Sequence, residues 1–424
     1  MIVTKFGGTS LADAQCIRRV ADIIRSDPQR RFVVVSAPGK RFPEDVKITD
    51  QLYRFQSTGD PTDFIPIEDR FDTIIRELGI ELDLSDDYAE MKNEPHNADY
   101  MASCGEYLAA RIIAAYLGWH FVDAEFCIFF DEYGHLDELR TSQTIQKTLQ
   151  GLPCAVLPGY YGAMPDGQVR TFSRGGSDIS GALVAAAMGA DTYENWTDVS
   201  GVLAADPRIV PQAIAIPEIT YAELSEMTSR GASVLHEDAV RPVWEQRIPI
   251  HICNTFRPAD AGTWIHADSI PNGFPVTGVA GRKGFSVVQV DQNDFDDIDR
   301  HIHRTLVSLE NRHIPAEYMT MGESSFSLIV SSEMTDVCCR ALREDGERIS
   351  ADSVLVKDRV ATLAIIGNKI KDRPEMKEQL FSAFEEMGIN VSMIDRDDSQ
   401  MSIVICLAEE HFSTGMRAVY DKFF

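Results

Sequence analysis

The chain has 424 residues, which is enough for two to four domains of about 150 residues each. Its composition, 44% hydrophobic and 25% charged, excludes a largely disordered chain, a collagen-like fibre and a disulfide-stapled mini-protein. The formal net charge of −26 argues against nucleic acid or an anionic membrane as the main partner, so a phosphate-bearing ligand needs local basic groups and backbone amides.

Cysteines and apolar segments bear on compartment and metal binding. The eight cysteines are scattered without a C-x-x-C pair, which favours free thiols in a reducing compartment over a disulfide framework or a metal site. The first residues lack a basic region followed by an apolar stretch, and Gly, Pro or Asp interrupts every apolar run well short of the ~20 residues of a membrane span. We therefore predict a cytoplasmic protein with no metal cage.

Short apolar runs alternate with helical patterns over the N-terminal two-thirds of the chain. The runs typical of strands are residues 2–4, 32–35, 155–157 and 248–252. Helical periodicity follows in residues 11–24 and 179–188. Because β-branched runs separated by helices indicate a parallel sheet covered on both faces, we predict an α/β sandwich up to about residue 265. The acidic segment 60–95 is predicted to form surface helices, without an assigned role.

The C-terminal third contains an internal repeat. The matched blocks, each pair 75 positions apart, are 285–290 with 360–365, 314–319 with 389–394 and 324–330 with 399–405. Each copy reads as strand, helix, strand, strand, helix and a closing strand, the ferredoxin-like βαββαβ order. We therefore predict two such domains, at 276–350 and 351–424, that are able to pair edge to edge. Duplication alone does not indicate a ligand site.

Two glycine turns each lead into a predicted helix and carry charged residues. Lys5 precedes Gly7 and Gly8, whose backbone can bend tightly and turn N–H groups toward an anion. In the second turn Arg174 offers a planar fork suited to a carboxylate or phosphate, and Asp178 falls in the first helical turn. Neither turn matches the P-loop or Rossmann spacing, and each alone is also compatible with a plain turn. Two of them in one α/β domain favour an anion site.

Further motifs complete a set that resembles a known family. They are Ser103-Cys104-Gly105-Glu106, Trp196 to Gly201, Asp206-Pro207-Arg208 and Asn254-Thr255-Phe256. With the two glycine turns, they resemble the amino-acid kinase family and, more closely, the aspartate kinases, whose tandem ACT domains are similar to the C-terminal repeat. The resemblance covers nearly the whole chain. It implies an amino-acid kinase fold, an αβα sandwich with a mainly parallel sheet over residues 1–270, followed by the two ACT domains.

The resemblance also implies an activity and a set of site residues. The activity is transfer of the γ-phosphoryl group of ATP to the side-chain carboxylate of L-aspartate, with Mg²⁺ bridging the nucleotide phosphates, in lysine, threonine and methionine biosynthesis. The implied residues are Lys5, Arg174 and Asp178 for catalysis, Ser36, Thr49, Glu106 and Arg174 for the substrate, and Lys5, Gly7, Gly8, Thr197, Asp198 and Arg208 for the nucleotide. Arg174 with Glu106 favours a free amino acid over N-acetylglutamate or UMP.

The ACT repeat implies regulation by an amino acid. The acidic loop 291–299 and Glu317 favour a cationic effector such as lysine over threonine, although acidic loops are usually solvated faces. The implied effector residues are Asp297, Glu317, Met321 and Glu323. Because ACT domains of such enzymes pair between chains, the resemblance implies a homodimer or a dimer of dimers.

The sequence departs from the family pattern at three places. Leu203 stands where many aspartate kinases have Tyr, and Ser233 stands where many have Lys. The loop 39–46 is longer than usual. Basic residues able to replace the missing charge are Lys40, Arg41 and Lys47. Two alternatives therefore stay open, a catalytically weakened amino-acid sensor and another amino-acid kinase of the glutamate or acetylglutamate type, although a sensor would need none of the charged site residues.

Overall fold

A computed structural model provides the structure of the chain. It describes residues 1–93, 97–173, 175–232, 235, 237–268, 276–291, 298–322, 325–345, 354–367, 370, 374–391, 393–395 and 401–424. The first compact unit comprises Met1–Val202, Ala215–Leu224 and Val234–Pro271. The second comprises Leu203–Ile214, Ser225–Ser233 and Asn272–Phe424. Within the described ranges, every helix is too short or too polar to cross a membrane.

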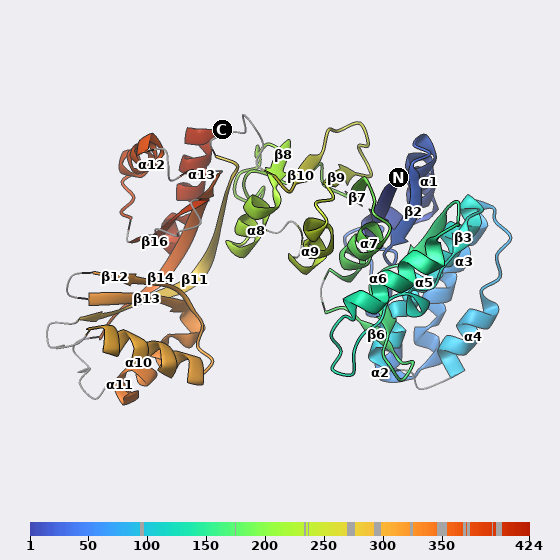
Figure 1. Ribbon diagram of the computed structural model, residues 1–424, viewed down its shortest axis with the longest axis horizontal. Helices are drawn as coiled ribbons and strands as arrows, with labels where there is room; N and C mark the ends of the chain where they lie inside the picture. The colour runs from blue at the N-terminus through green and yellow to red at the C-terminus, as the bar shows by residue number, and fades with distance from the viewer. Residues whose placement is uncertain are drawn as a thin grey trace. The chain divides into compact units, whose positions relative to one another are not determined.

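An eight-stranded sheet lies at the centre of the first unit (Figure 1). Its order is β3-β4-β2-β1-β7-β9-β10-β8. The strands are β1 (Ile2–Phe6), β2 (Arg30–Val35), β3 (His120–Phe121), β4 (Ala155–Pro158), β7 (Thr192–Thr197), β8 (Glu218–Thr220), β9 (Ile250–Asn254) and β10 (Thr263–His266), beside a separate hairpin of β5 (Tyr161–Ala163) and β6 (Val169–Thr171). The strands from β3 to β9 in this order run parallel, and β10 is antiparallel to β9. The predicted, mainly parallel sheet is confirmed.

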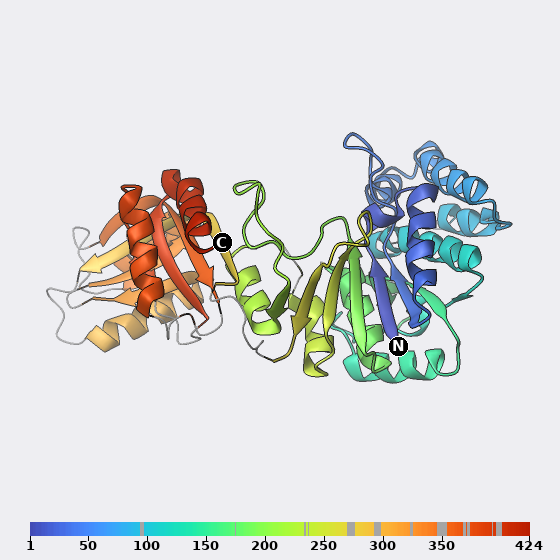
Figure 2. The ribbon, with the colours of Figure 1, turned by 90° about the horizontal axis from the view of Figure 1, so that it is seen from above.

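Helices cover both faces of this sheet, which Figure 2 shows with its strands side by side. The helices of the first unit are η1 (Gly8–Leu11), α1 (Ala14–Ser26), α2 (Ile48–Thr58), η2 (Pro61–Asp63), α3 (Ile65–Leu78), α4 (Ser85–Asn93), α5 (Ala98–Leu117), η3 (Ala124–Phe126), α6 (Glu138–Leu149), α7 (Gly176–Ala187) and α9 (Glu237–Glu245), and α8 (Tyr221–Ser229) has residues in both units. Side chains of α1 to α5 form one core cluster with Phe6, Val33 and Val35. On the other face, α7 packs on β1, β2 and β7, with α6 and α9 beside it. Because successive side chains of a strand alternate, Phe6 joins the first cluster and its neighbour Lys5 is turned toward α7.

The acidic segment 60–95 has a larger structural role than the prediction of surface helices. Phe64, Phe71 and Tyr88 are buried in the main core cluster. The Phe64 ring meets the rings of Phe55 and Tyr88 edge to face, at centroid distances of 5.0 and 6.1 Å. Apart from Arg70, which is buried, the described charges of the segment lie on the outer sides of amphipathic helices whose apolar sides help to build the core.

A single antiparallel sheet forms the centre of the second unit, in the order β12-β13-β11-β14-β16-β15. Its strands are β11 (Gly278–Asp291), β12 (Ala316–Met321), β13 (Ser325–Ser331), β14 (Val354–Ile366), β15 (Met393–Asp395) and β16 (Ser402–Ala408). Its helices are α10 (Ile298–Asn311), η4 (Ser332–Met334), α11 (Thr335–Asp345), α12 (Pro374–Glu386), η7 (Glu409–His411) and α13 (Phe412–Phe423). Among the described residues, each predicted copy thus contributes three strands and two α-helices.

The two long strands β11 and β14 join the copies. Residues 278–282 of β11 pair with 362–366 of β14, and residues 287–290 pair with 354–357. The first half of β11 therefore pairs with the second copy's part of the sheet, and the first half of β14 pairs with the first copy's part. These two half-strands take the place of the predicted closing strands. The predicted architecture, a sandwich with a mainly parallel sheet followed by a ferredoxin-like repeat region, is confirmed. The boundaries at 270, 276–350 and 351–424 stay predictions, and segments 203–214 and 225–233 belong to the second unit although they precede residue 270.

Candidate active site

The predicted phosphate-binding residues lie at the carboxyl ends of central parallel strands. β2, β4 and β3 lie on one side of β1 in the sheet, whereas β7 and β9 lie on its other side. The strand order therefore reverses between β1 and β7, and ligands of open parallel sheets bind in the crevice at such a point. Lys5 near the end of β1, and Thr197 and Asp198 at the end of β7, share this edge.

Lys5 and Asp178 form an ion pair at this edge. Lys5 Nζ lies 2.6 Å from Asp178 Oδ1, and the lysine is only 7% exposed. Asp178 lies in the first turn of α7, where the positive end of the helix dipole favours a carboxylate. Gly175 begins that helix in the left-handed region, at φ 58°. A Cβ on Gly7 would lie 3.7 Å from Nζ, so the structure brings both predicted glycine turns to one ammonium group.

The glycine turn after β1 packs against the loop after β2 at backbone contact distance. The Gly39 N–H donates to the Gly8 carbonyl at 2.7 Å. A Cβ on Gly8 would lie 2.7 Å from the Ala37 carbonyl oxygen, which explains the need for glycine there. Ser36 lies in the same loop, and its N–H donates to the Phe6 carbonyl at 3.2 Å.

The N–H of Gly7 is already engaged. It donates to the carbonyl of Trp196, at the end of β7, at 3.0 Å. The role of Gly7 is therefore steric: because it has no side chain, the space beside Lys5 Nζ stays open. The Gly8 N–H, at the start of η1, is the better placed of the two predicted amide donors, because the first N–H groups of a helix have no intrahelical acceptor.

Glu106, on α5, is buried beside the loop after β2. It is 6% exposed, and it accepts a hydrogen bond from the Ala37 backbone N–H. Among the described residues, its Oε2 atom has no hydrogen-bond partner. Burial raises the pKa of this carboxyl to about 8. A Cβ on the adjacent Gly105 would lie 3.2 Å from Ile48 Cγ2, so α5 packs closely on the start of α2, which carries Thr49.

Hydrogen bonds connect the loops that follow β1, β7 and β9. The Thr255 N–H donates to the Thr197 carbonyl at 2.9 Å, and the Thr255 and Ser10 hydroxyls are 2.8 Å apart. The Asn254 side chain donates to the Asp198 carbonyl at 3.4 Å. Thr197 and Asp198 are therefore anchored through their backbones, while both side chains remain near the surface.

Other predicted residues belong to the second unit or lie outside the described residues. Arg208 belongs to the second unit, where its exposed guanidinium pairs with Asp206 at 2.7 Å. Leu203 also belongs to the second unit. Arg174 and Ser233 lie outside the described residues.

The unusually long loop 39–46 is held by a buried charge cluster. Asp45 accepts from Arg41 Nε at 2.8 Å and from Arg70 Nη1 at 2.9 Å, and these guanidinium groups, Arg41 first, lower the pKa of its carboxyl. Arg70 also donates to the backbone carbonyls of Ala12 and Gly39. Arg41, one of the candidates for the missing charge, is thus engaged in holding the loop.

Two residues of the site were not predicted from the sequence. Asn195, on β7, donates from Nδ2 to Asp178 Oδ1 at 2.7 Å. Tyr160, after β4, has a φ of 81°, a strained value for a residue with a side chain. Its N–H donates to Ser180 Oγ at 3.0 Å, and a Cβ on Gly176 would lie 2.5 Å from its ring. The sequence signal for the first was a polar residue inside a run that forms a buried strand.

Two of the predicted effector residues, Glu317 and Met321, lie on β12. The Glu317 carboxylate pairs with Arg282 Nη2 at 2.6 Å. Met321 lies at the end of the same strand and is 57% exposed. Asp297 and Glu323 lie outside the described residues.

Comparison with known proteins identifies the family. A sequence model of the amino acid kinase family matches residues 1–254, and one of the ACT domain matches residues 363–423. Aspartokinase 3 of Bacillus subtilis (strain 168) is 30% identical over 448 aligned residues, covering 100% of this chain and 99% of the relative. The chain belongs to the aspartokinase family.

Further aspartokinases are similar over most of their length. The crystal structure of Clostridium acetobutylicum aspartate kinase has a TM-score of 0.89 and 36% identity, covering 100% of this chain and 99% of that chain. Lysine-sensitive aspartokinase 3 of Escherichia coli (strain K12) is 26% identical and covers 92% of both chains. Membership of the aspartokinase family confirms the predicted enzyme class, a kinase with an ACT region.

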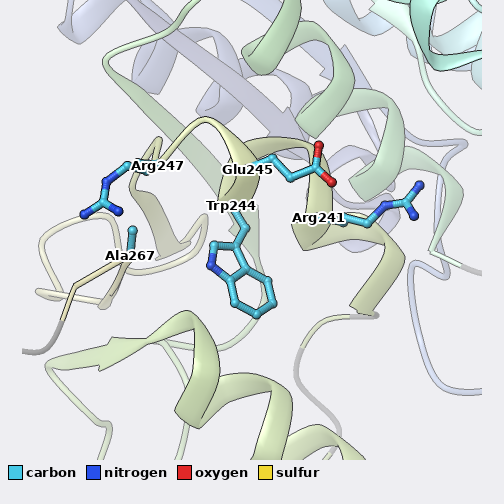
Figure 3. Close-up of a pocket in the computed structure, with 5 residues that line it drawn as sticks. All are labelled: Arg241, Trp244, Glu245, Arg247 and Ala267. Carbon is cyan, nitrogen blue, oxygen red and sulfur yellow. The ribbon is translucent and has the colours of Figure 1, made fainter.

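A separate pocket of about 470 Å³ opens beside α9. Its lining residues are Arg241, Trp244, Glu245, Arg247 and Ala267 (Figure 3). Arg241 pairs with Glu138, and Arg247 pairs with Asp268. Because both lining guanidinium groups already have carboxylate partners, we assign no ligand to this pocket.

Proposed function

We propose that the chain transfers the γ-phosphoryl group of ATP to the side-chain carboxylate of L-aspartate, forming 4-phospho-L-aspartate and ADP. The reaction would be the first step in the biosynthesis of lysine, threonine and methionine. The observation that carries the proposal is the Lys5–Asp178 ion pair beneath a glycine turn, in a chain that belongs to the aspartokinase family.

The groups around Lys5 fit the needs of phosphoryl transfer. The reaction depends mainly on positioning and charge stabilisation, and the substrate carboxylate itself attacks the phosphorus, so no enzyme nucleophile is required. Lys5 Nζ would donate to the transferred phosphoryl group, with the Gly8 N–H as a second donor. Asp178 would orient Lys5. The low exposure of this ammonium strengthens its attraction to the phosphoryl charge.

The buried carboxylate of Glu106 supports the choice of an amino acid as substrate. Its unpaired Oε2 would accept the α-ammonium group, which would satisfy a buried acceptor that is costly to leave unpaired. We assign Arg174 to the α-carboxylate and Ser36 and Thr49 to the walls of the substrate site. An N-acetylated substrate would present no ammonium group to Glu106.

The nucleotide would lie along the loops after β7. We assign it to Thr197 and Asp198, and the nucleotide contact of Arg208 stays a prediction from the family resemblance. Mg²⁺ would arrive with ATP, because it is usually held by one or two carboxylates, substrate phosphates and water. Asp178 and Asp198 are the carboxylates at this edge of the sheet, and the described residues contain no group of three or more candidate metal ligands. The metal would neutralise charge on the phosphates.

We further propose that an amino acid regulates the activity through the ACT region. Lysine, threonine or both are candidates, and the name of the lysine-sensitive relative supports lysine. Glu317 is paired with Arg282, so a cationic effector would have to replace that guanidinium. Met321 would line the same site, and we also assign Asp297 and Glu323 to it. Inhibition requires that the effector bind the less active arrangement more tightly.

We also propose that the chain forms a homodimer or a dimer of dimers in the cytoplasm. Exposed apolar residues on β14, Leu355 and Val356, support pairing through the ACT region. All eight cysteines are free, as expected in a reducing compartment. Light scattering coupled to gel filtration would measure the oligomeric state.

The test is coupled ADP release with MgATP and L-aspartate, compared with L-glutamate and N-acetyl-L-glutamate. Of the three acceptors, only L-aspartate is expected to give turnover with MgATP. The Lys5→Ala substitution should abolish that turnover. Repeating the assay with millimolar lysine or threonine tests the effector. Turnover with another acceptor only would refute the proposed reaction, and no turnover with lysine still bound would favour the sensor alternative that Leu203 and Ser233 keep open.

A further inference from the structure

The Asp178 carboxylate is held by two donors from neighbouring strands. Oδ1 accepts from Lys5 Nζ at 2.6 Å and from Asn195 Nδ2 at 2.7 Å. Lys5 on β1 and Asn195 on β7 are paired in register, so their side chains leave the sheet on the same face. Because a carboxylate only accepts hydrogen bonds, the asparagine must present its NH₂ group to it.

The hydrogen bond to Asp178 accounts for the presence of a buried asparagine side chain in β7. Asn195 is 2% exposed, and burying an amide costs free energy unless its hydrogen bonds are satisfied. The start of α7 is already fixed through its backbone, because the Tyr193 hydroxyl donates to the Asp178 carbonyl at 3.1 Å. The Asn195 hydrogen bond therefore acts on the Asp178 side chain and adds little to the docking of the helix.

The two donors differ in charge, which matters during phosphoryl transfer. As Lys5 engages the phosphoryl group, its hold on Asp178 weakens, and a carboxylate held by Lys5 alone would be free to turn. A neutral donor fixed to β7 keeps Oδ1 in place without competing with Lys5 for the phosphate. We propose that Asn195 is a positioning residue, which fixes Asp178 so that Lys5 stays aligned through the reaction. This inference rests on the proposed function.

The test compares Asn195→Ala with Asn195→Asp in the full chain. For Asn195→Ala we expect kcat to fall roughly 10- to 100-fold, the range for losing a hydrogen bond to a charged group, with KM for ATP and aspartate changed less than about 3-fold. Asn195→Asp has the same shape but places two carboxylates together. A proton shared between them can restore the hydrogen bond, so its kcat relative to Asn195→Ala should rise as the pH falls from 8.5 to 6.

The matched control is Thr4→Val on β1. The Thr4 hydroxyl is buried without a partner among the described residues, and Thr4 is paired in register with Glu194, next to Asn195. Wild-type kcat is expected for this variant, because its side chain alternates with Lys5 and leaves the sheet on the opposite face. The inference is overturned if Asn195→Ala keeps the wild-type kcat, if it raises only KM, or if Asn195→Asp shows the same pH profile as Asn195→Ala.

A structural measurement separates this inference from the proposed function. In a crystal structure of Asn195→Ala with a non-hydrolysable ATP analogue bound, so that Lys5 is engaged by phosphate, we expect the Asp178 carboxylate to turn away from Lys5 or to occupy a second rotamer. An unchanged ion pair would overturn the inference whatever the enzyme's substrate. Failure of the wild-type chain to phosphorylate aspartate would instead overturn the proposed function, and the variant structure would still decide the role of Asn195.

Discussion

Glu106 is expected to release a proton when L-aspartate binds. Burial raises the pKa of its carboxyl from the ordinary 4.5 to about 8. With that pKa, about 0.9 of the free chains carry the proton at pH 7. The proposed contact with the α-ammonium requires the carboxylate. Binding at pH 7 should therefore release about 0.9 proton per site, and affinity should be roughly 10-fold weaker than above pH 8.

Titration calorimetry measures this release directly. Aspartate is titrated at pH 7, with a non-hydrolysable ATP analogue present, in two buffers with different ionisation enthalpies. The slope of the observed enthalpy against the buffer enthalpy gives the number of protons. Glu106→Gln is the control, because an amide has no proton to release in this range. Zero release by the wild-type chain, with an affinity that is flat from pH 6 to 9, would refute the reasoning about Glu106.

The same carboxyl should make stability depend on pH. The folded chain holds the proton more tightly than the unfolded chain, so the stabilising contribution is complete below about pH 4.5 and is lost as the pH rises toward 8. The full loss is at most about 5 kcal/mol, at 1.36 kcal/mol per pH unit. The Tm of Glu106→Gln relative to wild type should therefore increase between pH 5 and 8. A constant difference in Tm would contradict the burial of an ionising group.

Three further substitutions test the rest of the site. Asp178→Asn should lower kcat roughly 100-fold with little change in KM, because its charge orients the lysine, and steady-state kinetics that show only a raised KM would contradict this. Gly8→Ala puts a Cβ 2.7 Å from the Ala37 carbonyl oxygen, so both Tm and kcat should fall; wild-type values would show that the loop can open. Arg70→Met leaves Asp45 with one fewer partner, at a cost of about 3–5 kcal/mol, and a change below about 1 kcal/mol in denaturant unfolding would refute that.

The elements that position the site could be predicted because their signals are local. A β-branched run before a glycine turn and an apolar helical stripe indicate strand, turn and helix in order, and this placed Lys5 and Asp178 at the ends of their elements. The likeness between copies 75 residues apart predicted the C-terminal domains in the same way. In the acidic segment 60–95, frequent charges concealed the apolar side on which Phe64 and Phe71 are buried.

Features that depend on register or on distant partners could not be predicted. That Asn195 meets Asp178 follows from the pairing of β1 with β7, which no local pattern specifies. The unpaired oxygen of Glu106 depends on how α5 packs against the loop after β2. The Asp45–Arg70 contact joins residues 25 positions apart, and the exchange of half-strands between β11 and β14 depends on how the two copies meet.

The charges of the site resolve an apparent conflict between an acidic chain and an anionic substrate. At physiological ionic strength, exposed charges more than about 8 Å away are largely screened, so ATP responds to the groups at the edge of the sheet and little to the net charge of −26. A second cation at the position of Asn195 would bind the phosphates equally well before and during transfer, which lowers KM without raising kcat. The neutral amide of Asn195 adds no positive charge beside Lys5. It holds Asp178 in place, and Asp178 in turn keeps the Lys5 ammonium group oriented.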